Sequence, residues 1–478
     1  MTKDNSSKNV FFNTLLTVCQ FIFPVLTFPY LARILMPEGL GVINFLDNII
    51  QYLIFVVGLG IPIYGVREIA RSRNNQEERA RTFNELLFIN ILSAITILII
   101  YAAVLYLLKD KIVYMQFYIL SGFVVLLNIF NVEWLFQGLE EFSYITKRSI
   151  GVKTIAIILT FCLVKNPGDI VYYYYIMILS YFINAVINLN HARLKFNFTF
   201  RLVWEFERLK KHFKPILLIF SANLAISLFL YFDSFILGLL SGTTAVGLYM
   251  TAIKLVKIPV MIIAAFINAL VPQISYAVKH KEYDDVQRLI DKSFNYVVFL
   301  SIPIVVGIMI SAEFIIYLFA GANFTESVLP LRIMCPAIIP LALTNIFVWQ
   351  ILTPFSKERY FMITVIVGMV ASLSLNFVLI PLISQNGTAI STLVTETIIC
   401  LLSFIFAKKV FHYKIKSTKI LQSFTACIPM VIFYLLLNRF VGDFMIRNIV
   451  LIALAIGSYF AIQMFLFKNN ILKEFKFS

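Results

Sequence analysis

Long apolar stretches recur along this chain and constrain its fold more than any other feature of the sequence. Fourteen stretches of about twenty mostly apolar residues are separated by short polar segments: 10–32, 41–64, 86–108, 113–137, 147–165, 170–190, 215–240, 245–273, 294–320, 328–353, 361–382, 387–407, 420–438 and 447–467. A helix needs about 20 apolar residues to cross the hydrocarbon core of a bilayer. The pattern therefore predicts an all-α, polytopic membrane protein with about fourteen transmembrane helices.

The composition excludes the main classes of soluble protein. Hydrophobic residues make up 60% of the chain and charged residues 14%, against roughly 45–50% and 25% in soluble domains. A soluble fold cannot bury this much apolar surface, because even large domains leave much of their surface in water. The five cysteines lie in apolar stretches without the spacing of a metal site, and we interpret them as reduced packing residues.

The basic residues indicate how the spans are oriented. With the N-terminus placed in the cytoplasm, 30 of the 40 Lys and Arg fall in inside segments, six fall outside and four lie within spans. Positive charge favours cytoplasmic loops, so both termini are expected inside the cell, and the first span is interpreted as uncleaved. The basic residues that give the net charge of +15 are therefore explained by the orientation of the spans in the membrane. No nucleic-acid partner is expected.

A weak internal repeat divides the chain into two halves. Leu31–Ile43 and Leu237–Tyr249 are similar at an offset of 206 residues, and each joins an odd span to the next even one. In both copies the even helix is expected to be interrupted near its inner end, by Gly60 and Pro62 in the first and by Pro272 in the second. Duplicated halves around a central cavity are common in transporters; the alternative is chance similarity of apolar sequence.

The repeat predicts two pseudo-symmetric six-helix lobes followed by two further helices. The longest inside loop, rich in Arg, Lys, Phe and Trp, reads as an interfacial connector between the lobes. The predicted domains are an N-terminal lobe (1–191), a basic cytoplasmic connector (192–214), a C-terminal lobe (215–410), and two extra transmembrane helices with a cytoplasmic tail (411–478).

Five segments carry a resemblance to a known family, in order, over nearly the whole chain. They are FPYLARILMPEGLGVINFLDNIIQYLIFVVGLGIPIYGVREIAR (28–71), EWLFQGLEEFSYITKRS (133–149), DSFILGLLSGTTAVGLYMTAIKL (233–255), NALVPQIS (268–275) and LNFVLIPLISQNGTAISTLVTE (375–396). In order and spacing they resemble the Wzx-type polysaccharide flippases of the multidrug/oligosaccharidyl-lipid/polysaccharide exporter superfamily. The pattern departs in IPLISQNGTA, where we expect a glycine near Ser384.

The resemblance implies a flippase and not an enzyme. Its cargo would be an oligosaccharide repeat unit on undecaprenyl pyrophosphate, moved from the inner to the outer leaflet of the bacterial cytoplasmic membrane for O-antigen, capsule or related polysaccharide. It also implies coupling to a proton or sodium gradient, with a polysaccharide polymerase and a chain-length regulator as partners. A multidrug or cation antiporter of the same superfamily is the alternative. A membrane polymerase is disfavoured, because every predicted outside loop is short.

Ionisable side chains inside spans mark the candidate substrate site, because each costs at least about 2.5–3.5 kcal/mol at the bilayer centre. Lys254 and Lys257 are three residues apart and share a helix face. We expect them to bind the pyrophosphate, with Asn48 and Gln51 at the matching positions of the other half; the alternative is a structural pair with a carboxylate. Arg67, at the cytoplasmic end of the second span, is expected to meet the incoming headgroup, unless it only sets topology.

Carboxylates within spans are the candidate ion-coupling groups. Asp233 and Asp47 are expected to bind the coupling proton or sodium ion, or else to pair with a lysine. Glu133 and the neighbouring Trp134 are expected at the membrane interface; the alternative is contact with the sugar of the cargo. No metal site, nucleotide site or other cofactor is expected, because no ligand spacing or glycine-rich phosphate loop occurs. Further candidates for the cavity are Arg33, Glu133, Arg332, Glu313 and Glu396.

Overall fold

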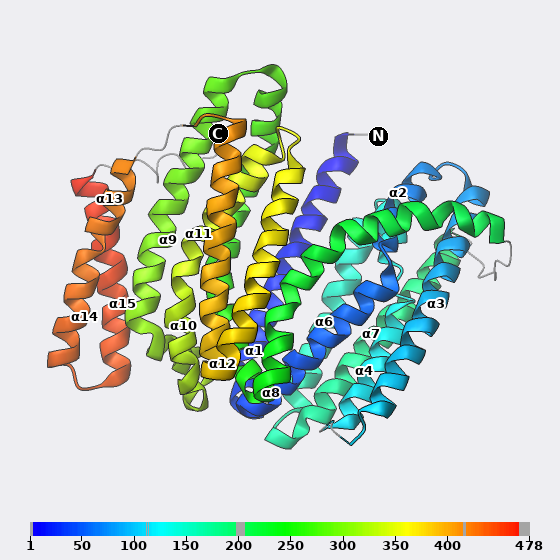
Figure 1. Cartoon of the computed structure of the whole chain (residues 1–478), viewed down its shortest axis with the longest axis horizontal. Coiled ribbons are helices and arrows are strands. Elements are labelled where there is room, and N and C mark those ends of the chain that lie inside the picture. The colour runs from blue at the N-terminus through cyan, green and yellow to red at the C-terminus, as the bar shows by residue number, and fades with distance from the viewer. Residues whose placement is uncertain (1–2, 111, 113, 197–205, 414–416, 468–478) are drawn as a thin grey trace. The chain divides into compact units, whose positions relative to one another are not determined.

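The computed structural model describes residues 3–110, 112, 114–196, 206–413 and 417–467 (Figure 1). These residues form helices and short connections, without strands. The chain divides into two compact units, Met1–Tyr231 and Phe232–Ser478. The centre of the predicted connector (197–205) and most of the predicted tail (468–478) lie outside the described residues. The predicted domain boundaries stay a prediction.

The first unit contains seven α-helices and the start of an eighth among its described residues. The helices are α1 (Lys3–Gly58), α2 (Ile61–Arg71), α3 (Gln76–Leu107), α4 (Met115–Asn128), α5 (Glu133–Gly138), α6 (Phe142–Leu163), the short 3-10 turn η1 (Pro167–Asp169), α7 (Ile170–Phe196) and the beginning of α8 (Phe206–His280).

The second unit continues α8 and adds the remaining helices. They are α9 (Tyr283–Ala320), η2 (Ala322–Ser327), α10 (Val328–Met334), η3 (Cys335–Ala337), α11 (Ile338–Asn345), the π-helix η4 (Ile346–Leu352), α12 (Glu358–Val410), α13 (Ser417–Ala426), α14 (Ile428–Phe440), α15 (Phe444–Ala461) and η5 (Ile462–Leu466).

Three long helices each contain a kink that separates two of the predicted spans. The kinks lie at Met36 in α1, at Gly242 in α8, and at Ile383 and Ser384 in α12. Ten described segments are long and apolar enough to cross a membrane, three of them across such a kink. The all-α, polytopic fold predicted from the apolar stretches is confirmed.

The turn in α12 explains the departure at Ser384. Ser384 has φ 49° and ψ −128°, a conformation that favours glycine because a Cβ clashes with the backbone there. The family pattern leads us to expect glycine near this position, and the chain accepts a strained serine instead. Gly387 follows directly, where a Cβ would lie 2.5 Å from the carbonyl oxygen of Leu379.

The predicted interruption of the even helix occurs in the first half only. Gly60, with φ 87°, precedes α2, and Pro62 lies in its first turn, where proline's missing N–H costs no helical hydrogen bond. The expected interruption at Pro272 is wrong, because α8 keeps helical dihedrals through that residue. Pro272 has no glycine beside it, so the backbone lacks the left-handed residue that ends a helix.

The short helix α2 packs closely on α5 because glycines remove side chains at the contact. A Cβ at Gly65 would lie 2.5 Å from the Trp134 ring, and one at Gly138 would lie 2.9 Å from Ile69. Trp134 is 5% exposed and lies 5.8 Å from the Phe83 ring. Trp134 therefore packs inside the protein, where the missing side chain of Gly65 makes room for its ring; its place at the membrane interface stays a prediction.

Candidate functional site

A polar cluster surrounds Asp233 inside the helices of the second unit. Asp233 Oδ1 accepts hydrogen bonds from the Ser372 hydroxyl and from Asn376 Nδ2, the latter at 2.7 Å. Thr392 Oγ1 lies 3.5 Å from Asp233 Oδ2 and 3.0 Å from the Tyr249 hydroxyl. One carboxylate from α8 is thus held by the two halves of α12.

The cluster supplies several oxygen atoms around one negative charge. Asn376 is fully buried, and its Oδ1 has no hydrogen-bond partner among the described atoms. Carboxylate, amide and hydroxyl oxygens suit hard cations, and carboxylates inside transporters also serve as proton acceptors. The residues around Asp233 are therefore compatible with a small cation or a proton, and the sequence reasoning identified the aspartate without its neighbours.

Lysine charge reaches this cluster from the same helix. Lys257 is exposed and Lys254 half-buried on α8. The charge of Lys257 acts on Asp233 and also on Glu396, a half-buried carboxylate of α12. Two groups that the sequence assigns to different roles, the pyrophosphate lysines and the coupling aspartate, therefore share one electrostatic neighbourhood.

The candidates on the second half of α1 lie among tyrosines. Asp47 is half-buried, and its charge acts on Tyr173, Tyr181 and Tyr231. Asn48 is 5% exposed and Gln51 is half-buried. Three tyrosines of the first unit are therefore within the electrostatic reach of Asp47.

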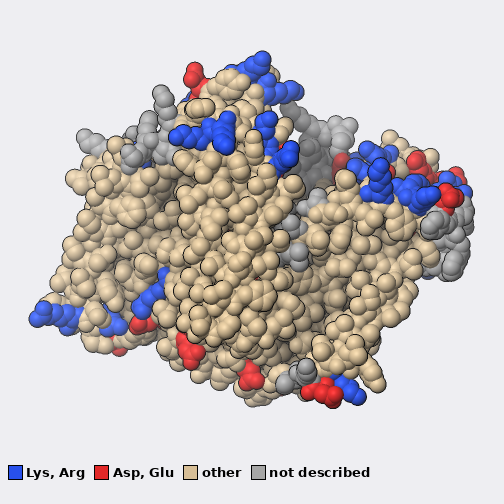
Figure 2. All heavy atoms as spheres, viewed as in Figure 1, with Lys and Arg blue, Asp and Glu red and all other residues tan. Residues whose placement is uncertain are grey.

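Arg67 lies on α2 directly after the interruption at Gly60. Its Nε is 3.1 Å from Glu68 Oε1, its guanidinium lies 5.0 Å from the centre of the Tyr64 ring, and its side chain is 49% exposed. Figure 2 shows Lys and Arg side chains gathered over the α2 and α3 end of the first unit. Arg67 is thus oriented by two neighbours and remains open to an anionic ligand.

Glu133 belongs to a buried polar network in the first unit. It pairs with Arg148 of α6, which also donates to Asn188 of α7. The Tyr144 hydroxyl donates to the same Asn188 oxygen at 2.9 Å, and Asn188 Nδ2 donates to Asn131 at 3.0 Å. The side chain of Arg148 is 3% exposed and that of Glu133 is 33% exposed. Arg148 was not a predicted site residue, although it lies in the segment 133–149 that carries the resemblance.

The other candidates lie nearer the ends of their helices. Arg332 of α10 pairs with Glu313 of α9 at 3.2 Å and also donates to the carbonyl of Met309. Both side chains of the pair are well exposed. Arg33 is exposed just before the kink of α1. The Glu313–Arg332 pair therefore links two helices of the second unit.

A second buried ionic cluster was missed by the sequence reasoning. Glu85, Tyr64 and His212 are all buried, and His212 is hydrogen-bonded to both of the others. The sequence placed His212 in the predicted cytoplasmic connector (192–214) and Glu85 just before the predicted span 86–108. The only signal in the sequence was Glu85 itself, a single carboxylate beside an apolar stretch. Such a carboxylate indicates a buried site only when its buried partner is known.

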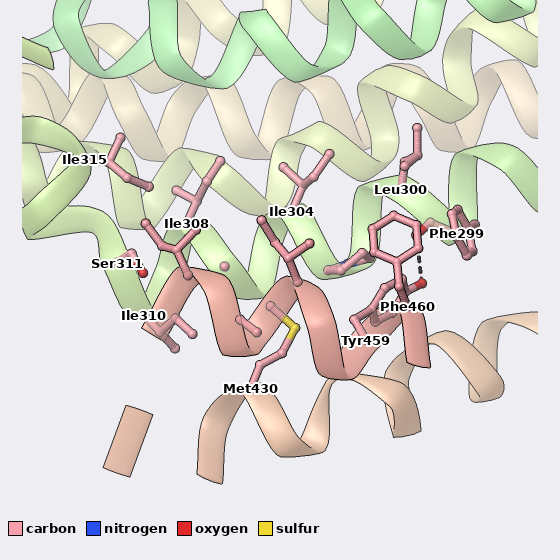
Figure 3. A pocket seen from close by; sticks show the side chains of 15 residues that line it. Phe299, Leu300, Ile304, Ile308, Ile310, Ser311, Ile315, Met430, Tyr459 and Phe460 are labelled. Atoms are coloured by element: carbon pink, nitrogen blue, oxygen red, sulfur yellow. Dashed lines mark hydrogen bonds between the residues drawn. The ribbon is translucent and has the colours of Figure 1, made fainter. Parts of the chain in front are cut away.

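An apolar pocket of about 300 Å³ lies between α9, α14 and α15. Figure 3 shows Ile304, Ile308 and Met430 pointing into it, with Tyr459 and Phe460 near one end. The Tyr459 hydroxyl donates to the carbonyl of Phe299 at 2.7 Å, so its polar atom is satisfied within the protein. The lining is almost entirely hydrocarbon, which suits an apolar chain better than a polar solute.

Similar sequences place these features in a family. The family described as polysaccharide biosynthesis protein matches residues 6–278, more than half of the chain. A protein of Escherichia coli (strain K12) named "Putative O-antigen transporter" is 25% identical over 409 residues, which cover 84% of this chain and 96% of that one. "Lipid II flippase MurJ" of Bacillus subtilis (strain 168) is 28% identical over 206 residues, 41% of this chain and 38% of that one.

Solved structures share the fold at low sequence identity. The structure titled "Lipid II flippase MurJ, inward closed conformation" has a TM-score of 0.70 at 14% identity and covers 97% of this chain and 100% of its own. An inward-facing multidrug resistance transporter of the MATE family and MOP superfamily has a TM-score of 0.66 at 14% identity, covering 82% and 94%. The chain belongs to the polysaccharide biosynthesis protein family and is a multi-span membrane transporter, as its resemblance to the Wzx-type flippases predicts.

Proposed function

We propose that this protein flips undecaprenyl-pyrophosphate-linked oligosaccharide repeat units from the inner to the outer leaflet of the bacterial cytoplasmic membrane. Ion-coupled alternating access drives the step, and the product feeds surface polysaccharide synthesis. The names of the relatives in Escherichia coli and Bacillus subtilis support a lipid-linked saccharide as cargo. A polymerase and a chain-length regulator would then act on the flipped product.

One observation carries this proposal: positive and negative charges lie together within spans of the second unit. Lys257 acts electrostatically on both Asp233 and Glu396. Such groups are costly in a bilayer and are retained for polar cargo or for ions. An ammonium group binds phosphate oxygens as a point charge, whereas a drug or cation antiporter has less use for lysine at such a site.

Asp233 is the proposed coupling group, and the lysine gives the coupling a mechanism. With the carboxylates free, Lys257 is attracted to them. A proton or sodium ion at Asp233 removes that attraction and leaves the ammonium for pyrophosphate. A ligand shifts a conformational equilibrium only by its different affinity for the two states. Here Lys257 exchanges the carboxylates for pyrophosphate, so the affinity for pyrophosphate differs between the ion-free and ion-bound protein. Asp47, among the tyrosines of the first unit, is the second candidate.

The apolar pocket supports a lipid as part of the cargo. Its walls come from α9, α14 and α15, which belong to segments long and apolar enough to cross a membrane. An isoprenyl chain would gain about 0.8 kcal/mol per buried methylene relative to water, but far less relative to lipid. The pocket is therefore proposed to orient the tail rather than to hold it tightly.

The experiment is flipping in proteoliposomes with an imposed proton or sodium gradient. Asp233→Asn should remove gradient stimulation, because a neutral amide mimics the occupied carboxylate and cannot release the ion. Asp47→Asn is tested beside it. Asp284→Asn, at the exposed start of α9, is the matched control and should behave as wild type. Full stimulation in both Asp233→Asn and Asp47→Asn would exclude these carboxylates from coupling.

A further inference from the structure

A buried hydrogen-bonded chain joins α2, α3 and the first turns of α8. The Tyr64 hydroxyl lies 2.8 Å from His212 Nδ1, and His212 Nε2 lies 2.8 Å from Glu85 Oε2. Tyr64, His212 and Glu85 are 4%, 2% and 0% exposed. Burial raises the pKa of Tyr64, and the nearby Glu68 raises it further. The imidazole therefore bridges the two side chains, with the Tyr64 hydroxyl paired to Nδ1 and the Glu85 carboxylate paired to Nε2.

The carboxylate at the end of this chain is expensive to bury. Lys211 Nζ lies 2.9 Å from Glu85 Oε2, with its side chain half-exposed. Glu85 Oε1 has no hydrogen-bond partner among the described atoms. A buried ionic group adds little stability over a well-packed apolar one, whereas removing one partner is strongly destabilising. The arrangement therefore fits the fixing of one particular geometry better than general stabilisation.

The backbone of α8 approaches α2 again one turn later. A Cβ at Gly60 would lie 3.0 Å from Ile216 O and 3.1 Å from Phe220 N. The rings of Phe55 and Phe220 stack with their centres 5.1 Å apart. The first turns of α8 are thus docked at two points on the turn and helix that follow α1, and α8 then continues past Tyr231 into the second unit.

The same tyrosine lies under Arg67. The guanidinium is 5.0 Å from the centre of the Tyr64 ring on one face of α2, while the hydroxyl of that ring is held by His212. A side chain that orders Tyr64 therefore also orders the surface on which Arg67 lies. Preorganised arginines bind phosphate more tightly, because less side-chain freedom is lost on binding.

We propose that His212 is a positioning residue: through Tyr64 it fixes the end of α2 that carries Arg67, and through Glu85 it fastens the first turns of α8 to the same end of the first unit. We call Tyr64, His212 and Glu85 the clasp. The part that concerns Arg67 relies on the proposed function, in which this arginine meets a pyrophosphate headgroup. The docking of α8 does not depend on it.

Two substitutions at one position separate hydrogen bonding from packing. His212→Leu fills a similar space and removes both hydrogen bonds. His212→Gln offers one oxygen acceptor and one nitrogen donor, so it can still accept from Tyr64 and donate to Glu85. His280→Leu, on the exposed end of the same helix, is the matched control.

The first readout is hydrogen–deuterium exchange of the full-length protein in detergent, read over residues 61–71 and 206–220. We expect His212→Leu to speed exchange in both segments by about tenfold, because local opening is governed by the contacts that close it. His212→Gln and His280→Leu should stay within about twofold of wild type. Equal exchange in His212→Leu and wild type would overturn the clasp.

The second readout uses Trp134, whose ring packs on Gly65 of α2, as a fluorescent reporter. With Trp204 and Trp349 replaced by Phe, Trp134 fluorescence is titrated with inorganic pyrophosphate. We expect His212→Leu to raise the half-saturating concentration several-fold with the same final signal, and His212→Gln to restore it. An unchanged half-saturating concentration in His212→Leu would overturn the positioning of Arg67.

The two readouts separate this inference from the proposed function. If wild-type Trp134 does not respond to pyrophosphate, the headgroup role of Arg67 is wrong and so is its positioning by His212. The exchange experiment then still decides whether the clasp docks α8. A response in wild type without any effect of His212→Leu in either readout would contradict the clasp alone.

Discussion

Met36 and Gly242 stand 206 residues apart in the chain and have nearly the same backbone conformation. Met36 has φ 59° and ψ 175°, and Gly242 has φ 84° and ψ 174°. Each separates the two helices of a pair. The offset equals that of the sequence repeat, so both halves build the same turn at the same place. Only glycine adopts this region without strain, which costs about 1–3 kcal/mol for other residues.

This relationship predicts opposite effects of two substitutions on stability. Met36→Gly should raise the apparent melting temperature in detergent, because relief of strain outweighs the extra freedom of an unfolded glycine, about 0.5–1 kcal/mol. Gly242→Ala should lower the melting temperature, because the strain destabilises the folded protein by about 1–3 kcal/mol. A Cβ at Gly242 meets nothing within 4 Å, so packing does not contribute. Gly457→Ala, in α15 and equally open, should be neutral or stabilising.

Replacing Lys254 and Lys257 together with Gln should abolish polymer export without loss of insertion. Gln cannot neutralise pyrophosphate, whereas replacement of both by Arg keeps the charge and should retain part of the activity. Export is measured as surface polysaccharide in a strain lacking the native protein. Lys279→Gln with Lys281→Gln, two exposed lysines at the end of α8, is the control. Normal export by the first double variant would show that the pair does not bind cargo.

The Glu133–Arg148 pair should respond asymmetrically to loss of either partner. Glu133→Leu leaves a nearly fully buried guanidinium without its carboxylate and should cost about 3–5 kcal/mol. Arg148→Met leaves a carboxylate that is one-third exposed and that water can solvate, so the cost should be smaller. The double variant should recover much of the loss. Thermal unfolding of the three variants in detergent provides the measurement, and equal effects of the single changes would contradict the argument from burial.

Gly307→Leu should narrow the apolar pocket selectively. A Cβ at Gly307 meets only the Met430 methyl, at 3.7 Å, so a leucine enters open space rather than packed protein. If the pocket orients an isoprenyl tail, flipping of a long-chain substrate should fall several-fold while a short-chain analogue is moved normally. Gly457→Leu, which faces open space on α15, is the control. Equal loss with both chain lengths would indicate a general folding defect.

Both termini are predicted to be cytoplasmic, and cysteine labelling of intact cells tests this. In a background where the exposed Cys162 is replaced by Ser, a membrane-impermeant thiol reagent should leave Ser6→Cys and Ser478→Cys unlabelled. Gly442→Cys, in the exposed connection between α14 and α15, should react from outside. Labelling at either terminus would contradict the predicted topology and would require another orientation or another number of spans.

Apolar periodicity was sufficient for the helices, because each crossing must satisfy its own backbone hydrogen bonds within one segment of the chain. The sequence pattern was insufficient at Pro272, where the proline suggested a break but α8 continues as a helix. The difference is that Gly60 can adopt φ 87° and nothing near Pro272 can. Ser384 is the reverse case. The expected glycine is absent there, yet the chain still makes the turn, with a serine in a conformation that favours glycine.

Site residues were predictable where a charge stands alone in an apolar stretch. Asp233 was found in this way, whereas its neighbours Asn376 and Thr392 come from α12, more than 140 positions further along the chain. Short polar residues are common in transmembrane helices, so they gain meaning only once a carboxylate is known to lie beside them. The role of His212 was missed for the same reason, because its partners Tyr64 and Glu85 are far away in sequence.

The apolar pocket has a consequence for biosynthesis. One wall is α9, which ends at Ala320, and the opposite wall includes α15, which begins at Phe444. At about 5–20 residues per second, the ribosome needs roughly ten seconds to make the chain between them. During that interval α9 gains the helices that follow it, but the face that lines the pocket still lacks α15. A nascent chain released early would present an unfinished groove to the bilayer, and the apolar pocket becomes complete only when the last helices are inserted.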